Sequence, residues 1–331
     1  MGDNNHLAGK RILFFPTFTL GYEKHIKASM ERMGAVVDLY DERPDESFLS
    51  KAMIRINRDL IAKKINSYHR RILDETRSIR YDYIFFIRCE AFSVDVLKQF
   101  REHHPEAKMI VYFWDSFKNN KNSIRVKDVF DKTFSFDRFD CEQYKMTFLP
   151  LFYIDQYSNV MKPKSFKYKH LFIGTLHSDR YKVVRDINSF LTRDQCYFSY
   201  FYSPSELLYW KLKLTNKEIR SVKRSEVKFK QIEIDYILDL YGQSEIIIDI
   251  QHPNQTGLTM RTFECLGAKR KMITTNKDIV NYDFYNTNNI LIIDRDNVQI
   301  PQKFLNNEYE DIQEELYHKY SLTSWLCAVF S

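Results

Sequence analysis

Apolar residues in this 331-residue chain occur in short runs that alternate with longer amphipathic stretches. Short continuous apolar runs are typical of strands covered on both faces, and amphipathic stretches of ten or more residues are typical of helices. Their alternation predicts parallel sheets covered by helices. In the first half, the expected strands are 11–15, 35–40, 83–88, 108–113, 132–135 and 147–149, and the expected helices are 22–33, 47–78 and 94–102.

A second alternation follows residues 152–169, which we interpret as a linker because they contain Pro163 and several lysines. The chain length also favours about two domains. We therefore predict an α/β protein with domains at 1–155 and 165–319. In the second half, the expected strands are 170–173, 197–202 and 289–293, and the expected helices are 178–191, 227–241, 311–319 and 322–330.

Residues 246–276 are the most informative segment, because they predict a buried strand, a polar loop, a helix at about 258–268 and a second strand. The free amides and peptide dipoles at the start of such a helix attract phosphate. Arg261 and Glu264 are three residues apart and share one helix face. A guanidinium suits phosphate oxygens and a carboxylate suits paired ribose hydroxyls. The segment therefore predicts a nucleotide site.

The run GLTMRTFECLGA, residues 257–268, resembles the donor-site helix of GT-B glycosyltransferases, in particular the CgeB-like and the capsule or lipopolysaccharide biosynthesis enzymes. The resemblance implies two Rossmann-like domains facing a cleft, with the donor in the C-terminal domain and the acceptor mostly in the N-terminal one. It also implies that a C-terminal helix at about 320–331 packs back on the first domain, and that Glu264 holds the ribose of a nucleotide sugar. Retaining members often carry an acidic residue where this chain has Thr256, so inverting and retaining mechanisms both stay open.

Two strand-to-helix turns in the second half are candidate sites for the donor diphosphate, because amides and cations there would neutralise a leaving phosphate. One turn begins the motif helix. The other follows the strand at 170–173, where the alternative is an ordinary turn with Ser178 or Asp179 capping the next helix. The predicted donor-binding residues are Gly174, Thr175, Arg180, Thr256, Gly257, Leu258, Thr259, Arg261 and Glu264.

Carboxylates that follow strands of the first half are candidates for the base that deprotonates the acceptor, because ligands of α/β proteins gather at the carboxyl ends of strands. Asp115 is the first candidate, since Trp114 beside it would stack on a sugar. Glu90 and Asp137 follow neighbouring strands; each carboxylate is alternatively a helix cap or a salt-bridge partner. The predicted acceptor-binding residues are Thr17, Thr19, Gly21 and Trp114, of which the first three are alternatively plain turn residues.

Residues 207–230 form the strongest charge feature. They begin with the aromatic and apolar run at 207–210, and the remainder contains eight lysines and arginines against two glutamates. A basic segment with an aromatic anchor suits an anionic membrane surface. Nucleic acid would satisfy the same charges, although no RNA-binding motif accompanies them. A solvated insertion is the third interpretation.

Composition narrows the class of protein. Five scattered cysteines without a C-x-x-C motif fit a reducing cytosol and argue against structural zinc. No apolar run approaches the ~20 residues that a membrane span needs. We expect a cytoplasmic protein, with the inner face of the cytoplasmic membrane as a further location. No Asp-x-Asp motif is present, and the resemblance implies no metal and no cofactor beyond the nucleotide-sugar substrate.

The predicted function is transfer of a sugar from a nucleotide sugar to a capsule, lipopolysaccharide or similar surface-glycan acceptor, lipid-linked glycans included. One alternative is a non-catalytic GT-B-like partner in a glycan-assembly complex. The other is a basic nucleic-acid-binding module that uses residues 207–230.

Overall fold

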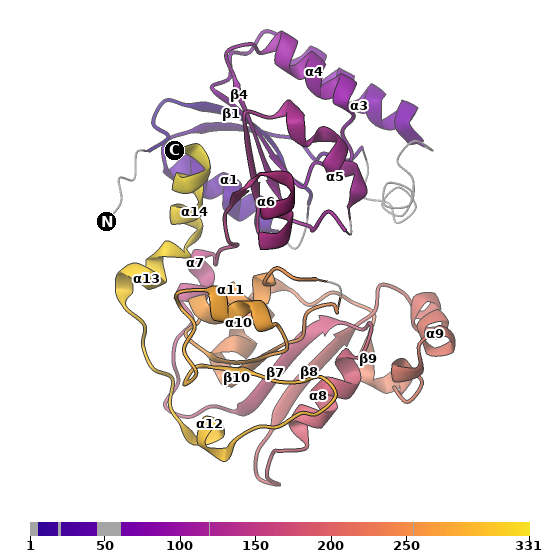
Figure 1. Cartoon of the computed structure of the whole chain (residues 1–331), viewed down its shortest axis with the longest axis vertical. Coiled ribbons are helices and arrows are strands. Elements are labelled where there is room, and N and C mark those ends of the chain that lie inside the picture. The colour runs from indigo at the N-terminus through magenta and orange to yellow at the C-terminus, as the bar shows by residue number, and fades with distance from the viewer. Residues whose placement is uncertain (1–5, 19–20, 45–60, 119, 254) are drawn as a thin grey trace. The chain divides into compact units, whose positions relative to one another are not determined.

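The computed structural model describes residues 6–18, 21–44, 61–118, 120–253 and 255–331 (Figure 1). The chain divides into two compact units. Unit 1 comprises Met1–Pro150 together with Leu322–Ser331, and unit 2 comprises Leu151–Ser321. Each unit is an α/β domain with its own parallel sheet, which is the fold class expected from the sequence.

Unit 1 contains a six-stranded parallel sheet with the strand order β2-β1-β3-β4-β5-β6. The chain moves from β1 to one edge and then returns to build the other side from β3. Strand order therefore reverses between β1 and β3, and crevices form at such points beyond the carboxyl ends of the strands. The strands are β1 (Arg11–Phe15), β2 (Val36–Leu39), β3 (Tyr83–Ile87), β4 (Lys108–Phe113), β5 (Lys132–Ser135) and β6 (Thr147–Phe148).

Helices cover both faces of the unit 1 sheet (Figure 1). Successive side chains of β3 alternate between the faces: Phe85 contacts Trp325 of the C-terminal helix, whereas Phe86 contacts Phe92 and Phe130 on the other side. The C-terminal helix thus belongs to the core of unit 1. The helices are α1 (Tyr22–Arg32), α3 (Ala62–Thr76), α4 (Val94–His103), α5 (Lys121–Val126), η2 (Lys127–Val129), α6 (Arg138–Tyr144) and α14 (Leu322–Phe330).

Unit 2 repeats this plan with the strand order β12-β11-β10-β7-β8-β9, again all parallel. The chain builds outward from β7 to β9 and then returns to β10. The reversal point therefore lies between β7 and β10. The strands are β7 (Tyr168–Thr175), β8 (Tyr197–Tyr202), β9 (Val227–Lys228), β10 (Ser244–Asp249), β11 (Lys271–Thr274) and β12 (Ile290–Ile292).

The helices of unit 2 bury one apolar side against this sheet. Ile246 and Ile248 of β10 are fully buried among side chains of α8 and of the segment after α9. No helix in the described ranges is long and apolar enough to cross a membrane. The helices are α7 (Asp155–Ser158), α8 (Arg180–Asn188), α9 (Glu206–Thr215), η3 (Lys217–Ile219), η4 (Arg224–Glu226), α10 (Ile234–Gln243), α11 (Met260–Gly267), η5 (Lys277–Asn281), α12 (Gln302–Asn306) and α13 (Glu314–Lys319).

Two sequence expectations about local structure are wrong. Residues 152–169 are not a plain linker, because they contain α7 and the buried Tyr153, whose ring packs so closely on Gly267 that an added Cβ would lie 2.6 Å from it. Residues 227–241 do not form one helix, because Val227 and Lys228 pair with β8 and α10 begins only at Ile234. The alternation of apolar and basic residues from 227 to 230 is the strand signal that distinguishes this edge. Much of the helix expected at 47–78 lies outside the described residues, and α3 covers its second half.

Candidate functional site

Three arginines from separate elements converge at the reversal point of unit 2. Arg180 begins α8, Arg261 lies in the first turn of α11, and Arg295 follows β12. Each guanidinium donates a hydrogen bond to a backbone carbonyl at or just beyond the carboxyl end of β7 or β10. The acceptors are the carbonyls of Ile250 at 2.7 Å and Thr175 at 3.1 Å for Arg180, Gln251 at 2.6 Å for Arg295, and Ile173 for Arg261.

The last residue of β10, Asp249, holds the beginning of α11 in place. Its fully buried carboxylate accepts hydrogen bonds from the hydroxyls of Thr259, at 2.9 and 3.0 Å, and Thr262, at 2.8 Å, and pairs with Arg261 at 3.3 Å. Thr259 occupies the N-cap position, yet its side chain makes no cap hydrogen bond. Because its hydroxyl bonds to Asp249 instead, Thr259 does not cap the first-turn amides of α11.

Burial and mutual repulsion make this cluster electrostatically favourable for an anion. Burial, together with the nearby Arg261 and Arg295, lowers the pKa of Arg180 to about 9. Burial opposes the charge of Arg261 as well, but Asp249, Tyr241 and Glu264 together outweigh it and the pKa of Arg261 is raised. Burial and the surrounding arginines lower the pKa of His177 to about 3, so its imidazole is neutral at pH 7. Coulomb attraction between the guanidiniums and a phosphate is strengthened where water is partly excluded.

Gly174 and Thr175 are the last two residues of β7, paired with β8, rather than the turn expected from the sequence, and they lie beside Arg180. A Cβ on Gly174 would lie 2.8 Å from Cζ of Phe172 and 3.4 Å from a terminal nitrogen of Arg180. Glycine therefore leaves the space that the Arg180 side chain occupies. Asp179 does not cap α8 with its side chain and instead pairs with Arg295 at 2.7 Å.

Glu264 lies one turn after Arg261 on α11 and is half-buried. Its carboxylate accepts a hydrogen bond from the hydroxyl of Tyr241 at 3.2 Å, and the buried Tyr241 packs edge-on against Tyr157. The loop before α11 is held by Asn276, whose amide donates to the carbonyls of Thr256 at 3.1 Å and Gly257 at 3.2 Å, while Leu258 is buried. The structure thus places Arg180, Arg261 and the start of α11 around one reversal point.

The sequence analysis did not identify Asp249 or Arg295 as residues of the site. The signal for Asp249 was an acidic residue at the end of an otherwise apolar strand, and the signal for Arg295 was a basic residue three positions after the last strand. In the described part of the chain, no group of three or more His, Cys, Asp or Glu side chains is arranged to hold a metal ion.

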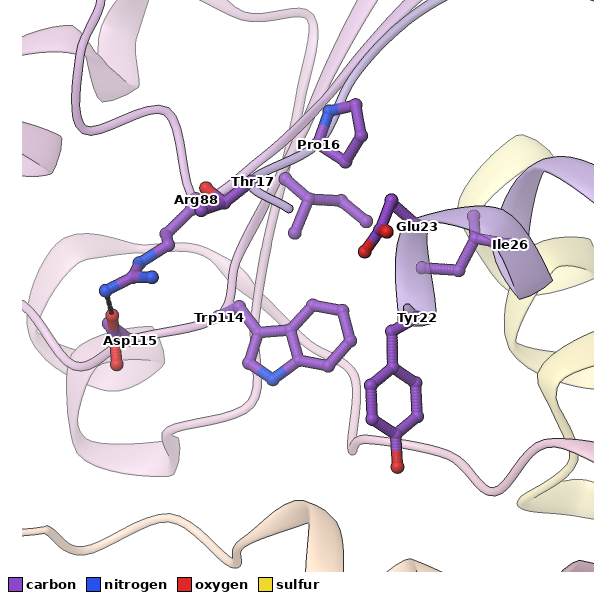
Figure 2. Close-up of a pocket in the computed structure, with 9 residues that line it drawn as sticks. Pro16, Thr17, Tyr22, Glu23, Ile26, Arg88, Trp114 and Asp115 are labelled. Carbon is purple, nitrogen blue, oxygen red and sulfur yellow. Dashed lines mark ion pairs between the residues drawn. The ribbon is translucent and has the colours of Figure 1, made fainter. Parts of the chain in front are cut away.

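Unit 1 has a pocket of about 270 Å³ at its own reversal point, where β1 and β3 end (Figure 2). The rings of Trp114 and Tyr22 both line it and pack edge to face against each other, with their centroids 5.9 Å apart. Among the residues predicted for the acceptor, Thr17 and Trp114 line the pocket, Gly21 caps α1 with a φ of 83°, and Thr19 lies outside the described residues. The lining residues are Pro16, Thr17, Tyr22, Glu23, Ile26, Ile87, Arg88, Trp114 and Asp115.

Carboxylates surround Arg88 at the wall of this pocket. Its guanidinium pairs with Asp115, as the dashed line in Figure 2 marks, and with Glu90 at 3.5 Å. Arg88 and Cys89 both have positive φ values, 81° and 54°, a strained backbone that often accompanies functional sites.

A third acidic residue near this wall, Glu42, is fully buried. Its two carboxyl oxygens accept hydrogen bonds from the Thr17 hydroxyl at 2.7 Å and from the Glu90 amide at 3.1 Å. Burial, and then the proximity of Glu90, raise the pKa of Glu42 to about 8. Most of this residue is therefore protonated at pH 7, and its bonds tie together the loops after β1, β2 and β3.

The three candidate bases occupy different positions. Asp115 lines the pocket, and Glu90 lies buried behind it beside Arg88. Asp137 is the buried N-cap of α6, where it accepts from the amides of Phe139 at 3.0 Å and Asp140 at 3.3 Å. Sequence reasoning missed Glu23, a pocket residue in the first turn of α1 that is only 5% exposed.

Two parallel six-stranded α/β units in one chain define the GT-B class of fold, and solved structures of that class superimpose on nearly the whole chain. One is the lipopolysaccharide outer core galactosyltransferase WaaB, with 10% identity over 96% of this chain and 98% of that chain and a TM-score of 0.52. A glycosyltransferase from Rickettsia africae gives 16% identity over 96% of both chains and a TM-score of 0.54.

The UDP-GlcNAc 2-epimerase of Methanocaldococcus jannaschii, solved with UDP-GlcNAc and UDP, also shares the fold: 10% identity over 86% of this chain and 89% of that chain, with a TM-score of 0.52. At such low identities the likeness shows the fold alone. No family model matches the chain, and no curated sequence does.

Proposed function

We propose that this protein is a glycosyltransferase that binds a nucleotide-sugar donor in unit 2 and a sugar acceptor in unit 1. The convergence of Arg180, Arg261 and Arg295 at the reversal point of unit 2 is the observation that carries the proposal. Three guanidiniums beside an uncapped helix start match the charge and geometry of a diphosphate. Glu264, one helical turn further on, would accept hydrogen bonds from ribose hydroxyls.

The proposed catalytic roles follow from where charge develops during sugar transfer. When the bond from the sugar to the diphosphate breaks, negative charge grows on the leaving phosphate, and the arginines of unit 2 stabilise it without reorganising. We propose that they do so in place of a metal ion. In unit 1, the Asp115 carboxylate would accept the proton of the attacking acceptor hydroxyl.

A nucleotide-sugar epimerase is the second candidate, because an epimerase with UDP-GlcNAc and UDP bound shares this fold. Both candidates use the same donor site. They differ in what is made: an epimerase returns an isomeric nucleotide sugar, whereas a transferase releases a nucleotide and needs an acceptor. The separate acidic and aromatic pocket of unit 1 favours transfer, since it offers a place for that acceptor.

Calorimetric titration with UDP, GDP, CMP and dTDP and with their sugars tests the donor site. We expect one nucleotide class to bind, Arg295→Gln to weaken that binding at least about tenfold through loss of a charge-assisted contact, and Arg193→Gln, an exposed arginine of the same unit, to change nothing. Absence of binding by every nucleotide, or equal affinity in Arg295→Gln, contradicts the proposal. The protein is then incubated with the identified donor and acceptor extracts in the presence of EDTA, and the products are analysed by NMR. A glycosylated acceptor indicates metal-free transfer, whereas an isomeric nucleotide sugar indicates epimerisation.

The acceptor class that we propose is a surface glycan, including capsule, lipopolysaccharide and lipid-linked precursors. Helix α9 supports a location at an anionic membrane. Leu207, Trp210 and Leu214 share one face of this helix and are exposed, the two leucines at 81% and 77%. Apolar side chains of this kind bind the membrane interface when basic residues surround them. The exposed basic residues of the same segment are Lys211, Lys217, Arg220, Lys223, Arg224, Lys228 and Lys230.

Vesicle sedimentation tests this location. We expect the protein to sediment with vesicles containing phosphatidylglycerol but not with pure phosphatidylcholine, and Trp210→Ser with Leu214→Ser to abolish sedimentation. Val280→Ser, an exposed apolar residue elsewhere in unit 2, is the control. Binding to oligonucleotides with no binding to either vesicle would instead favour the nucleic-acid alternative.

A further inference from the structure

Tyr241 supports Glu264 from a neighbouring helix of unit 2. Tyr241 lies in the last turn of α10, beside α11 in Figure 1, and its hydroxyl donates the 3.2 Å hydrogen bond to Oε2 of Glu264. Glu264 is half-buried, whereas Tyr241 is only 2% exposed. Burial, and then the charge of Glu264, raise the pKa of Tyr241 well above its ordinary value, so the hydroxyl keeps the proton that it donates.

Three contacts hold Tyr241 in place. Its backbone carbonyl accepts a hydrogen bond from Nε of the buried Arg270 at 2.9 Å. The same carbonyl accepts from the amide of Ser244, the residue that ends α10. Its ring packs edge-on against Tyr157 of α7, with the ring centroids 5.1 Å apart. Tyr241 is therefore a fixed hydrogen-bond donor, anchored at its backbone and at its ring.

A fixed donor limits the orientations of a glutamate side chain. Glutamate has several rotamers, and ordering them when a ligand binds costs conformational entropy. A hydrogen bond that exists before the ligand arrives removes part of this cost. A carboxylate offers about four acceptor positions on its two oxygens, so a bond from Tyr241 leaves capacity for ligand hydroxyls. The hydroxyl of Tyr241 thus favours one orientation of Glu264 without preventing it from binding a ligand.

We propose that Tyr241 is a positioning residue, which orients the Glu264 carboxylate toward the ribose of the donor and so makes unit 2 select nucleotides that carry both ribose hydroxyls. The inference rests on the proposed function, because it takes the ribose as the ligand of Glu264. Its basis is the bond from a buried, anchored hydroxyl to a half-buried carboxylate one helical turn after Arg261.

Calorimetric titration of the full-length protein with matched nucleotides tests the proposal. The probes are UDP, GDP, ADP and CDP, the 2′,3′-dideoxy form of whichever of these binds most tightly, and dTDP. The dideoxy form keeps the base and the diphosphate but lacks both hydroxyls. The ratio of the two Kd values, dideoxy to ribose form, therefore measures what the protein gains from the ribose hydroxyls.

We expect the wild type to bind the ribose form at least about tenfold more tightly than the dideoxy form, because hydrogen bonds to a charged carboxylate are lost. Tyr241→Phe should leave the Kd of the dideoxy form unchanged and weaken the ribose form, which lowers the ratio about threefold or more. Glu264→Gln should lower the ratio further, because it removes the charge of the acceptor itself.

Tyr317→Phe is the matched control. It also removes a buried tyrosine hydroxyl that bonds to α11, but this hydroxyl donates to the carbonyl of Gly267, at 2.6 Å, at the other end of the helix. The ratio should therefore stay at its wild-type value. Thermal unfolding of both variants, together with their affinity for the dideoxy form, reports whether unit 2 is still folded.

Four results overturn the proposal: equal affinity of the wild type for the two forms, tighter binding of dTDP than of every ribonucleotide, a Tyr241→Phe variant that weakens both forms equally, and one that weakens neither. If nucleotides bind in these cases and Arg295→Gln weakens them, the donor site stands and only the role of Tyr241 fails. If no nucleotide binds the wild type, the proposed function fails and this inference fails with it.

Discussion

The two units have the same plan but opposite charge at equivalent positions. Each has a six-stranded parallel sheet whose order reverses once, between β1 and β3 in unit 1 and between β7 and β10 in unit 2. At the first point lie Glu23, Asp115 and Arg88, and at the second lie three arginines, of which Arg261 and Arg295 pair with Asp249 and Asp179. The comparison teaches that topology places a site, whereas a few side chains at the strand ends decide what it binds.

A second contrast concerns the buried acid at each point. In unit 2, Asp249 pairs with Arg261 and accepts from two threonine hydroxyls, so it is a compensated carboxylate. In unit 1, Glu42 accepts only from Thr17 and the Glu90 amide among the hydrogen bonds that the structure describes for its carboxyl group, and its pKa is raised to about 8. The two acids should therefore respond differently to neutralisation.

The largest effect is expected for Asp249→Asn. Its neutral amide would leave the buried Arg261 guanidinium without a counter-charge, and breaking a buried pair in this way costs about 3–5 kcal/mol of unfolding free energy. Urea unfolding of 5-fluorotryptophan-labelled protein, followed by the fluorine NMR resonance of Trp210 in α9, measures the loss in unit 2. Asp311→Asn removes an exposed partner of Lys269 and should cost less than about 1 kcal/mol. Equal losses in both variants would contradict the assigned role of Asp249.

Glu42 should make the stability of unit 1 depend on pH. Its pKa rises from 4.5 to about 8 on folding, so the folded state holds a proton that the unfolded state loses between these values. The stabilisation is fully present below pH 4.5 and is lost as the pH rises through 8, at up to about 1.4 kcal/mol per pH unit. Urea unfolding of the wild type and of Glu42→Gln across this range measures it. Parallel decline of the two proteins would show that Glu42 does not titrate in this range.

Gly174→Ala should affect unit 2 more moderately. The new Cβ would collide with Phe172 and crowd Arg180, which we expect to cost about 1–3 kcal/mol and to weaken nucleotide binding. The matched control is Gly242→Ala in α10, where the nearest atom would be 3.8 Å away and a helical alanine should stabilise by up to about 1 kcal/mol. Thermal unfolding and nucleotide titration of both variants check the prediction. Unchanged nucleotide affinity in Gly174→Ala would show that this end of β7 is not part of the donor site.

The smallest expected effect is that of salt. Raising NaCl from about 0.05 M to about 0.5 M should weaken nucleotide binding in unit 2 roughly threefold, because ions screen the partly buried arginines only incompletely. Binding of a neutral sugar to unit 1 should not change, since it involves no net charge. Titrations at both concentrations make the comparison. If salt weakened the binding of both ligands equally, the two units would not differ in the electrostatics of ligand binding.

Sequence reasoning located the Arg261 and Glu264 helix, and it found Trp114 and Asp115 at a strand end, because each of these depends on a local pattern of apolar and polar residues. It misjudged residues 227–241, where a short alternation competed with a helical pattern, and it missed Asp249, Arg295 and Glu23. Asp249 and Arg295 gave only a weak signal, a charged residue at or after an apolar strand, and Glu23 gave none. Arg295 and Glu23 act through partners far away along the chain: Asp179 and the Gln251 carbonyl for Arg295, and the pocket formed with Trp114 for Glu23. The partners of Asp249 are nearer, at Thr259, Arg261 and Thr262, but only the fold brings their side chains to its carboxylate.

The sequence alone determined the alternation of strands and helices, the α/β class and the position of the motif helix, since helix and strand periodicity arise from neighbouring residues. Only the tertiary structure decided the order of strands within each sheet, and with it the two reversal points. Strand order depends on hydrogen bonds between segments far apart in the chain, such as β7 with β10. It was this long-range pairing that assembled the three arginines in unit 2 and the acidic pocket in unit 1.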